Sequence, residues 1–137
     1  MFAPLHRQRG VAPAELVRAV QDTIAPVGYS IYKSKDRMEE ALALVLEAGE
    51  RVSQLVAIDP HHLAAANEVR AMVLCAEMYY RASLAREESR GWHLREDFPD
   101  CDDDAWLKWI LLQDKDGHML LSTEDVPLAR YPVKLCP

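Results

Sequence analysis

The strongest constraint on the fold is a long helical pattern in the middle of the chain. Asp59 is a residue type that caps helices, and Pro60 follows at the first helical position, where a missing N–H costs nothing. Apolar residues then recur at three- and four-residue steps at Leu63, Ala66, Val69, Val73, Ala76, Tyr80 and Leu84. The spacing predicts a helix over 60–90, on the order of 45 Å long at about 1.5 Å per residue. We expect it to end near Ser89, with Gly91 as the left-handed closing residue.

Two shorter helical patterns precede this one. The first runs over 11–25 and is stopped by Pro26 and Gly28. The second runs over 35–57, and Ser34 is its expected N-cap. Because only a short Asp-Pro turn joins the second and third helices, these two must lie antiparallel, and the first helix can cover their seam. The chain is therefore predicted to be mainly α, with an antiparallel three-helix bundle that resembles a spectrin repeat.

The period of the pattern changes after the third helix. Residues 105–123 hold two apolar runs around the turn sequence Asp-Lys-Asp-Gly at 114–117, which predicts a β-hairpin. An irregular, extended tail is expected over 124–137. An isolated hairpin is only marginally stable in water, so this one must pack on the helices or on another domain. At this length we expect residues 1–137 to form a single domain.

Composition excludes several classes of protein. The net charge is −6, and the 16 basic residues are interleaved with acids, so we expect no nucleic-acid partner. No 18-residue apolar run is present, so we expect no membrane insertion. Three cysteines without a Cys-x-x-Cys pair predict a reducing, cytoplasmic location and no iron–sulfur site held by this chain alone. Cys75 lies in an apolar run and is expected to be buried.

The common cofactor and metal motifs are missing. The glycines, at 10, 28, 49, 91 and 117, are never two apart, which argues against a dinucleotide site. The aspartates at 100, 102 and 104 would begin a calcium loop only with Gly and Glu where Ala105 and Leu111 stand. His61 and His62 have no carboxylate or cysteine four residues after them and are expected at the surface. We therefore expect no catalytic, cofactor or metal residues in this chain.

One charged cluster allows a functional interpretation. Arg90, His93 and Arg95 lie within six residues, beside Glu88, Glu96 and Asp97. Arginine can bind a carboxylate or a phosphate through two parallel hydrogen bonds, and histidine titrates near neutral pH. One hypothesis places the cluster at a dicarboxylate or a flavin phosphate. The other, which we favour, has the cluster fix the helix end and the hairpin, and dock that surface onto a neighbouring domain.

The same stretch carries a resemblance to a known family. Ser89-Arg90-Gly91-x-His93-x-Arg95-x-Asp97-Phe98-Pro99, followed by Asp102, Asp103 and Trp106, resembles the hallmark of the C-terminal domain of succinate dehydrogenase/fumarate reductase flavoprotein subunits. More distant similarity runs to the adenylylsulfate reductase α subunit and to L-aspartate oxidase. The resemblance extends over nearly the whole chain, and it marks an interdomain and structural motif at Ser89, Arg90, Gly91, His93, Arg95, Asp97, Asp102, Asp103 and Trp106.

The resemblance implies a division of labour between domains. In that family FAD and the substrate-binding His and Arg residues lie on other domains, so the parent flavoprotein would carry FAD and this chain none. The expected partners are the flavin-binding domain of the same polypeptide and an iron–sulfur subunit, which would also provide any attachment to the membrane face. The isolated chain is expected to be inactive, and its bare docking surface could support a non-native dimer.

Two alternatives follow from the residues themselves. The chain could be a stand-alone helical interaction module that binds a partner through its bundle face or hairpin. It could also be a free-standing enzyme built on Arg90, His93 and the neighbouring acids, although no cofactor motif or second, cleft-forming domain supports this.

Overall fold

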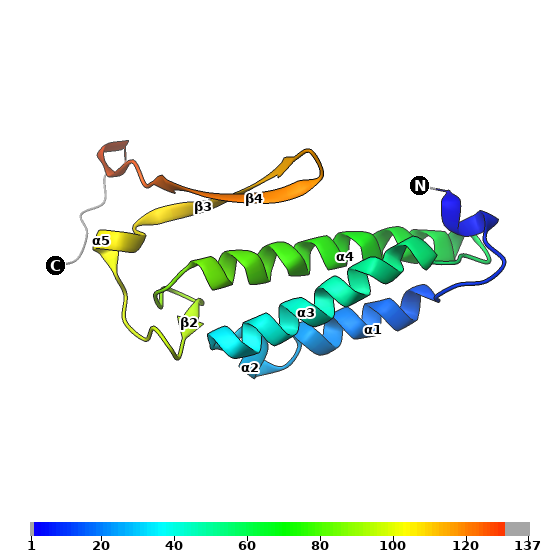
Figure 1. Ribbon diagram of the computed structural model, residues 1–137, viewed down its shortest axis with the longest axis horizontal. Helices are drawn as coiled ribbons and strands as arrows, with labels where there is room; N and C mark the ends of the chain where they lie inside the picture. Colours follow the sequence, from blue (N-terminus) through cyan, green and yellow to red (C-terminus); the bar gives the residue numbers. More distant parts are fainter. Residues whose placement is uncertain (1, 131–137) are drawn as a thin grey trace.

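The computed structural model describes residues 2–130 and has three long helices and a β-hairpin (Figure 1). The elements in chain order are η1 (Ala3–His6), α1 (Pro13–Ile24), α2 (Val27–Ser30), β1 (Tyr32–Lys33), α3 (Lys35–Arg51), η2 (Val52–Gln54), α4 (Pro60–Ala85), β2 (Leu94–Arg95), α5 (Asp103–Trp106), β3 (Lys108–Lys115), β4 (His118–Asp125) and η3 (Leu128–Arg130).

The long helices α1, α3 and α4 form the predicted antiparallel bundle. In Figure 1 they lie side by side, and α3 runs opposite to the other two. The apolar stripe of α4 faces inward as expected: six of its seven positions are buried, and Leu84 packs against the core. The opposing walls are formed by apolar side chains, namely Leu16 and Val20 of α1 and Met38, Ala41, Val45 and Ala48 of α3. The mainly α fold predicted from the sequence is confirmed.

The start of α4 follows the predicted capping chemistry. The Asp59 carboxylate accepts a hydrogen bond of 2.8 Å from the backbone N–H of His62, and Pro60 occupies the first turn. The same carboxylate oxygen also lies 2.8 Å from Nδ1 of the His62 ring, so the His62 side chain contacts the Asp59 cap. His61 is exposed, as expected.

The ends of two helices differ from the prediction. The third helix ends at Ala85 instead of residue 90, because Arg86 has extended backbone angles (φ −89°, ψ 112°). Gly91 does have positive φ (57°), but it closes a separate tight turn in which Arg90 and His93 exchange two backbone hydrogen bonds, and it is not a helix cap. The second helix ends at Arg51 instead of 57. Beyond η2 the chain is extended: the N–H of Val56 donates to the Val11 carbonyl, and the N–H of Val11 donates to the Gln54 carbonyl.

The hairpin is present, shifted by two or three residues from 105–123. Residues 103–106 form the short helix α5, and β4 continues to Asp125, so Glu124 and Asp125 are strand and not tail. The register pairs Leu112 with Leu121 and Lys115 with His118. Figure 1 shows the ribbon running along α4, which separates it from α1. Residues 126–130 of the predicted extended tail include the 3-10 turn η3, so this part is not simply extended. The tail from residue 131 lies outside the described residues.

Two further expectations concern single features. Cys75 is exposed and not buried, because the inward stripe of α4 passes through Val73 and Ala76 and leaves residue 75 on the outer side. Among the described helices, none combines the length and the apolar character needed to cross a bilayer.

The hydroxyl of Tyr80 provides a test of the core. Tyr80 is fully buried, and its O–H donates a 2.6 Å hydrogen bond to the carbonyl of Thr23 in the last turn of α1. Burial raises the pKa of this phenol to about 12, so it stays a donor. Tyr80→Phe should lower the free energy of unfolding by about 1–2 kcal/mol, because a buried carbonyl loses its partner. Exposed Tyr32→Phe is the control; equal denaturation midpoints for the two variants would contradict this account.

Candidate functional site

The charged residues predicted from the sequence meet where α4 ends and α3 begins. β1 and β2 form a short parallel pair, Tyr32 with Leu94 and Lys33 with Arg95, and the N–H of Glu96 donates to the Lys33 carbonyl at 2.8 Å. This pairing carries residues 88–98 back across the end of the bundle. We call this region the junction: residues 32–37, 83–98 and 102–108.

Arg95 is the centre of the junction. It is 2% exposed, and its guanidinium donates to three carbonyl oxygens at or just after the end of α4, those of Ser83 (3.0 Å), Leu84 (3.4 Å) and Arg86 (2.8 Å). A helix leaves its last carbonyls without intrahelical partners and has a partial negative charge there, so a cation satisfies both needs. The guanidinium also stacks 4.9 Å from the centre of the Phe98 ring.

Asp97 connects this cation to the start of α3. Its two carboxylate oxygens accept from Arg95 Nε and Nη2, each at 2.7 Å. One of them also accepts a 3.0 Å hydrogen bond from the backbone N–H of Lys35, the first residue of α3. The Arg95 hydrogen bonds, with the Lys35 amide adding to them, lower the pKa of Asp97 to about 2. Ser34 occupies the N-cap position as predicted, but its hydroxyl accepts from Arg37 Nε instead of capping the helix.

Glu88 is a completely buried carboxylate with three sets of donors. Arg90 binds it through two hydrogen bonds (2.8 and 3.0 Å), the N–H of Asp102 adds one of 2.9 Å, and Arg86 adds another. Burial alone would raise the pKa of Glu88, but these donors outweigh it and bring the value to about 2. Arg90 also binds Asp103 at 2.5 Å, and the two carboxylates raise its pKa.

Arg86 extends the network to the hairpin. It donates to the carbonyls of Trp106 (2.9 Å) and Lys108 (2.5 Å), and its guanidinium lies 5.5 Å from the centre of the Trp106 ring. These hydrogen bonds attach the connection from α5 into β3 to Arg86, the residue that directly follows α4. Asp102 caps α5 by accepting from the N–H of Ala105 at 2.9 Å.

Ser89 holds the loop between these charged residues. Its Oγ accepts from the Arg95 N–H at 2.8 Å and donates to the Phe98 carbonyl at 2.8 Å, while its own N–H donates to the Asp100 carbonyl. Because the hydroxyl is committed to backbone groups and no base contacts it among the described residues, the arrangement does not resemble an activated nucleophile.

His93 faces a lysine that the sequence did not single out. Its Nε2 lies 3.2 Å from the carbonyl of Arg86, and its Nδ1 lies 3.3 Å from Nζ of Lys33. The ammonium can only donate, so Nδ1 accepts and Nε2–H donates to the carbonyl. Burial, then the positive charge of Lys33, lowers the pKa of His93 to about 4. The ring is therefore neutral at physiological pH.

All nine residues predicted as a motif lie in the junction. Their charged groups bind one another and backbone carbonyls, so they are not arranged around a ligand. The acids receive donors from nearby arginines, and the arginines spend their N–H groups on these acids and on backbone carbonyls. Sequence reasoning missed Arg86 and Lys33. Nothing in the sequence marked Arg86 as part of the cluster except that it lies two residues before Glu88. The only sequence indication that Lys33 is buried is that it follows the apolar residues Ile31 and Tyr32.

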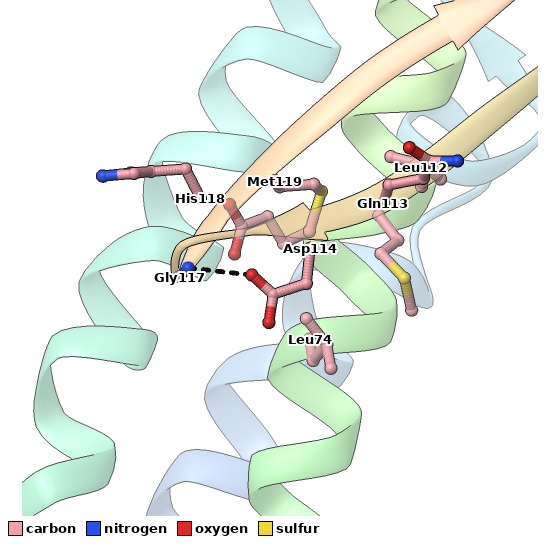
Figure 2. Close-up of a pocket in the computed structure, with 9 residues that line it drawn as sticks. Leu74, Leu112, Gln113, Asp114, Gly117, His118 and Met119 are labelled. Carbon is pink, nitrogen blue, oxygen red and sulfur yellow. Dashed lines mark hydrogen bonds between the residues drawn. The ribbon is translucent and has the colours of Figure 1, made fainter.

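Apart from the junction, a hollow lies under the hairpin turn. It measures about 320 Å³, and its apolar wall is formed by Leu74 and Met78 of α4 with Leu112 and Met119 of the hairpin. Figure 2 shows that Asp114 spends one oxygen on the turn itself, accepting from the N–H of Gly117 at 2.9 Å. In this view the His118 ring points away from Leu74 and Leu112. Of its other lining side chains, Asp114 binds the turn and Glu77 pairs with Arg81, so neither acid is free for a ligand.

The junction does not fit a flavin dinucleotide or a metal. A dinucleotide phosphate needs free backbone amides at a glycine-rich turn before a helix. Here β1 leads into α3 through Ser34, and the Asp97 carboxylate already binds the first amide of that helix. At α4 the Asp59 carboxylate has the same position, and α1 begins with Pro13. Within residues 2–130, no group of three or more His, Cys, Asp or Glu side chains is placed to hold a metal ion.

Comparison with known proteins shows the family of this chain. A family model described as "Fumarate reductase flavoprotein C-term" matches residues 17–135. The succinate dehydrogenase [ubiquinone] flavoprotein subunit of rice is 27% identical over 96% of this chain, and the fumarate reductase flavoprotein subunit of Mycobacterium tuberculosis is 30% identical over 93% of it. A chain of E. coli quinol fumarate reductase superposes with a TM-score of 0.79 over 93% of this chain, at 25% identity. This chain spans 20% and 23% of the length of the two curated relatives and 23% of the E. coli chain.

Removing the charge of Glu88 tests the buried network. Glu88→Gln keeps the shape of the side chain but leaves Arg86 and Arg90 without their shared counter-charge. We expect the free energy of unfolding to fall by about 3 kcal/mol, the scale seen when one partner of a buried ion pair is removed. The neighbouring Glu87 is exposed, so Glu87→Gln should change stability by no more than about 0.5 kcal/mol. Urea denaturation of both variants measures this, and similar values would contradict the network.

The neutral state of His93 predicts a pH dependence. Its pKa is lower in the folded chain (about 4) than the ordinary 6.5, so between these pH values the unfolded chain has a protonated His93 and the folded chain a neutral one. Stability should therefore decrease as pH falls from about 7 toward 4. Between pH 7 and 5 the wild type should lose about 1–2 kcal/mol more than His93→Gln, whose amide can still donate and accept. Exposed His61→Gln is the control and should follow the wild type; a parallel course for His93→Gln would remove this assignment.

Proposed function

The chain belongs to the fumarate reductase flavoprotein C-terminal family, and from this membership we propose that it is the helical C-terminal domain of an FAD-dependent oxidoreductase of the fumarate reductase/succinate dehydrogenase type. The observation that carries the proposal is the family match over residues 17–135, joined to a fold shared with quinol fumarate reductase. Residues 1–137 act as one domain in this proposal, and FAD is bound by the part of the flavoprotein that the chain does not span.

The role of the chain in that enzyme is to pack on the flavin domain. Its junction supports this role because Arg86, Arg90 and Arg95 are paired with acids of this chain and fix the ends of α3 and α4 in place. Large apolar side chains remain exposed near it, namely Trp92 at the Gly91 turn, Tyr32 on β1 and Trp109 on β3. Exposed aromatic residues on a rigid support are typical of protein–protein contacts.

The nine motif residues have a positioning role and not a catalytic one. They hold the surface that meets the flavin domain, and through that domain they influence the shape of the substrate site. The hairpin and its neighbours would also contribute to the surface offered to an iron–sulfur subunit. In this proposal the assembled enzyme lies in the cytoplasm, and partner subunits make any contact with a membrane.

Reconstitution tests this function. The mycobacterial relative, shortened by the portion that aligns with this chain, provides a flavin-binding partner. We expect the isolated chain to be colourless and inactive, to bind the shortened subunit with one-to-one stoichiometry, and to raise its retention of flavin and its fumarate-reducing activity at least tenfold. Absorbance near 450 nm, analytical ultracentrifugation and turnover measure these three properties.

Two outcomes would contradict the proposal. Stoichiometric flavin on the isolated chain would give this chain the cofactor site that the proposal assigns elsewhere. Absence of binding to the shortened subunit, at concentrations where the chain itself is folded by circular dichroism, would favour the alternative of a stand-alone helical interaction module.

A further inference from the structure

A hollow of about 430 Å³ opens beside the junction, between β1, the last turns of α4 and the start of β3. Most of its wall is apolar or aromatic, formed by Ile31, Tyr79, Ala82, Trp92 and Ile110. The charged or polar side chains that line it are Lys33, Arg86 and His93, together with the small residues Ser30 and Ser83. Among residues 2–130, no acidic residue lines this hollow.

Lys33 is the unusual member of this wall. The residue is 2% exposed, yet within residues 2–130 no carboxylate lies within ion-pair distance of its ammonium group. Its two contacts are the neutral His93 ring at 3.3 Å and the face of Tyr79, 5.3 Å from the ring centre. The Tyr79 hydroxyl donates to the Ser30 carbonyl, and as a neutral phenol it brings no negative charge to pair with the ammonium. A buried ammonium without a counter-charge is costly, and such groups in proteins are normally paired.

The neighbouring acids cannot supply the missing charge. Glu88 is bound by Arg86 and Arg90, Asp97 is bound by Arg95, and Asp103 is bound by Arg90. Among the four cations Lys33, Arg86, Arg90 and Arg95, the three arginines pair with Glu88, Asp97 and Asp103, and only Lys33 has no acid partner within residues 2–130. This unpaired residue lines the hollow.

We propose that this hollow receives one acidic side chain from the flavin domain, whose carboxylate pairs with Lys33. The inference rests on the proposed function, because it names a contact of the docking surface assigned there. The carboxylate would enter past Trp92, which is 85% exposed at the rim, and burial of this indole against the flavin domain would exclude water from the ion pair.

The chemistry of the wall favours a carboxylate on a protein over a free phosphate. Only one positive charge is uncompensated, whereas a phosphate dianion would need two. The arginine N–H groups that bind phosphate in other proteins are here spent on Glu88, Asp97 and backbone carbonyls. The apolar and aromatic lining suits the stem of a side chain and the protein surface around it.

Substitution of Lys33 should change stability and docking in opposite directions. In the isolated chain, Lys33→Met removes an unpaired buried charge and should raise the melting temperature by several degrees. Binding of the same chain to the shortened mycobacterial subunit should weaken at least tenfold, while Lys33→Arg, which keeps the charge, should lose less. The matched control is Lys35→Met, an exposed lysine two residues away that forms a surface pair with Glu39; it should leave both properties unchanged.

The outcomes separate this inference from the proposed function. If the wild type binds the shortened subunit and Lys33→Met binds equally well or better, the carboxylate contact is wrong and the domain assignment stands. If the wild type does not bind at all, the proposed function fails and its acidic partner fails with it. If 10 mM inorganic phosphate stabilises the wild type but not Lys33→Met, at matched ionic strength, the site takes a free anion and the flavin domain is not its occupant. If Lys33→Met instead abolishes a dimer of the isolated chain, the occupant is a second copy.

Discussion

The geometry of the junction depends on the Arg95 guanidinium, which joins two helix ends of opposite polarity. The last carbonyls of α4 carry partial negative charge, and Arg95 donates to them; the first amide of α3 carries partial positive charge, and Asp97, held by Arg95, accepts from it. Without this pair, both helix ends would face the interior with unsatisfied backbone groups, which is more costly than the loss of a surface ion pair. The parallel pairing of β1 with β2 places the pair where both helices can use it.

This arrangement explains why a cluster that looks suited to substrate binding serves structure instead. Three arginines and a histidine in a short span could bind a dicarboxylate, but each arginine is bound to an acid of this chain, and the histidine is neutral. A group that has satisfied its hydrogen bonds internally has little to offer a ligand. Rigidity is what remains, and rigidity at the base of an aromatic surface reduces the entropy lost when another domain binds there.

The sequence predicted the parts of the fold that depend on residues close together in the chain. It did not predict the helix ends whose backbone groups are bound by residues far away in the chain. The stripe from Leu63 to Tyr80 and the cap at Asp59 predict α4 because periodicity and capping act within a few residues. The end of α4 at Ala85 was missed, since nothing near Arg86 forbids a further turn; Arg95, nine residues later, binds the Arg86 carbonyl instead. Ser34 was the best local cap for α3, yet the amide of Lys35 is bound by Asp97, 62 residues away. The partners of Lys33 depend on a two-residue parallel strand pair, which leaves no periodic signal.

The paired arginines of the junction and the unpaired Lys33 have two different tasks. The paired charges make the end of the bundle rigid and contribute nothing to the choice of partner, because any surface would meet the same satisfied groups. A single unpaired ammonium beside aromatic side chains does discriminate: a partner that brings a carboxylate relieves the cost of the buried charge, whereas a purely apolar partner would bury that charge more deeply. On the proposal above, Lys33 lowers the stability of the isolated chain, and a partner that brings a carboxylate recovers the loss. Burial lowers the pKa of Lys33, the positive charge of Arg95 adds to the effect, and within the described chain no carboxylate at ion-pair distance opposes them.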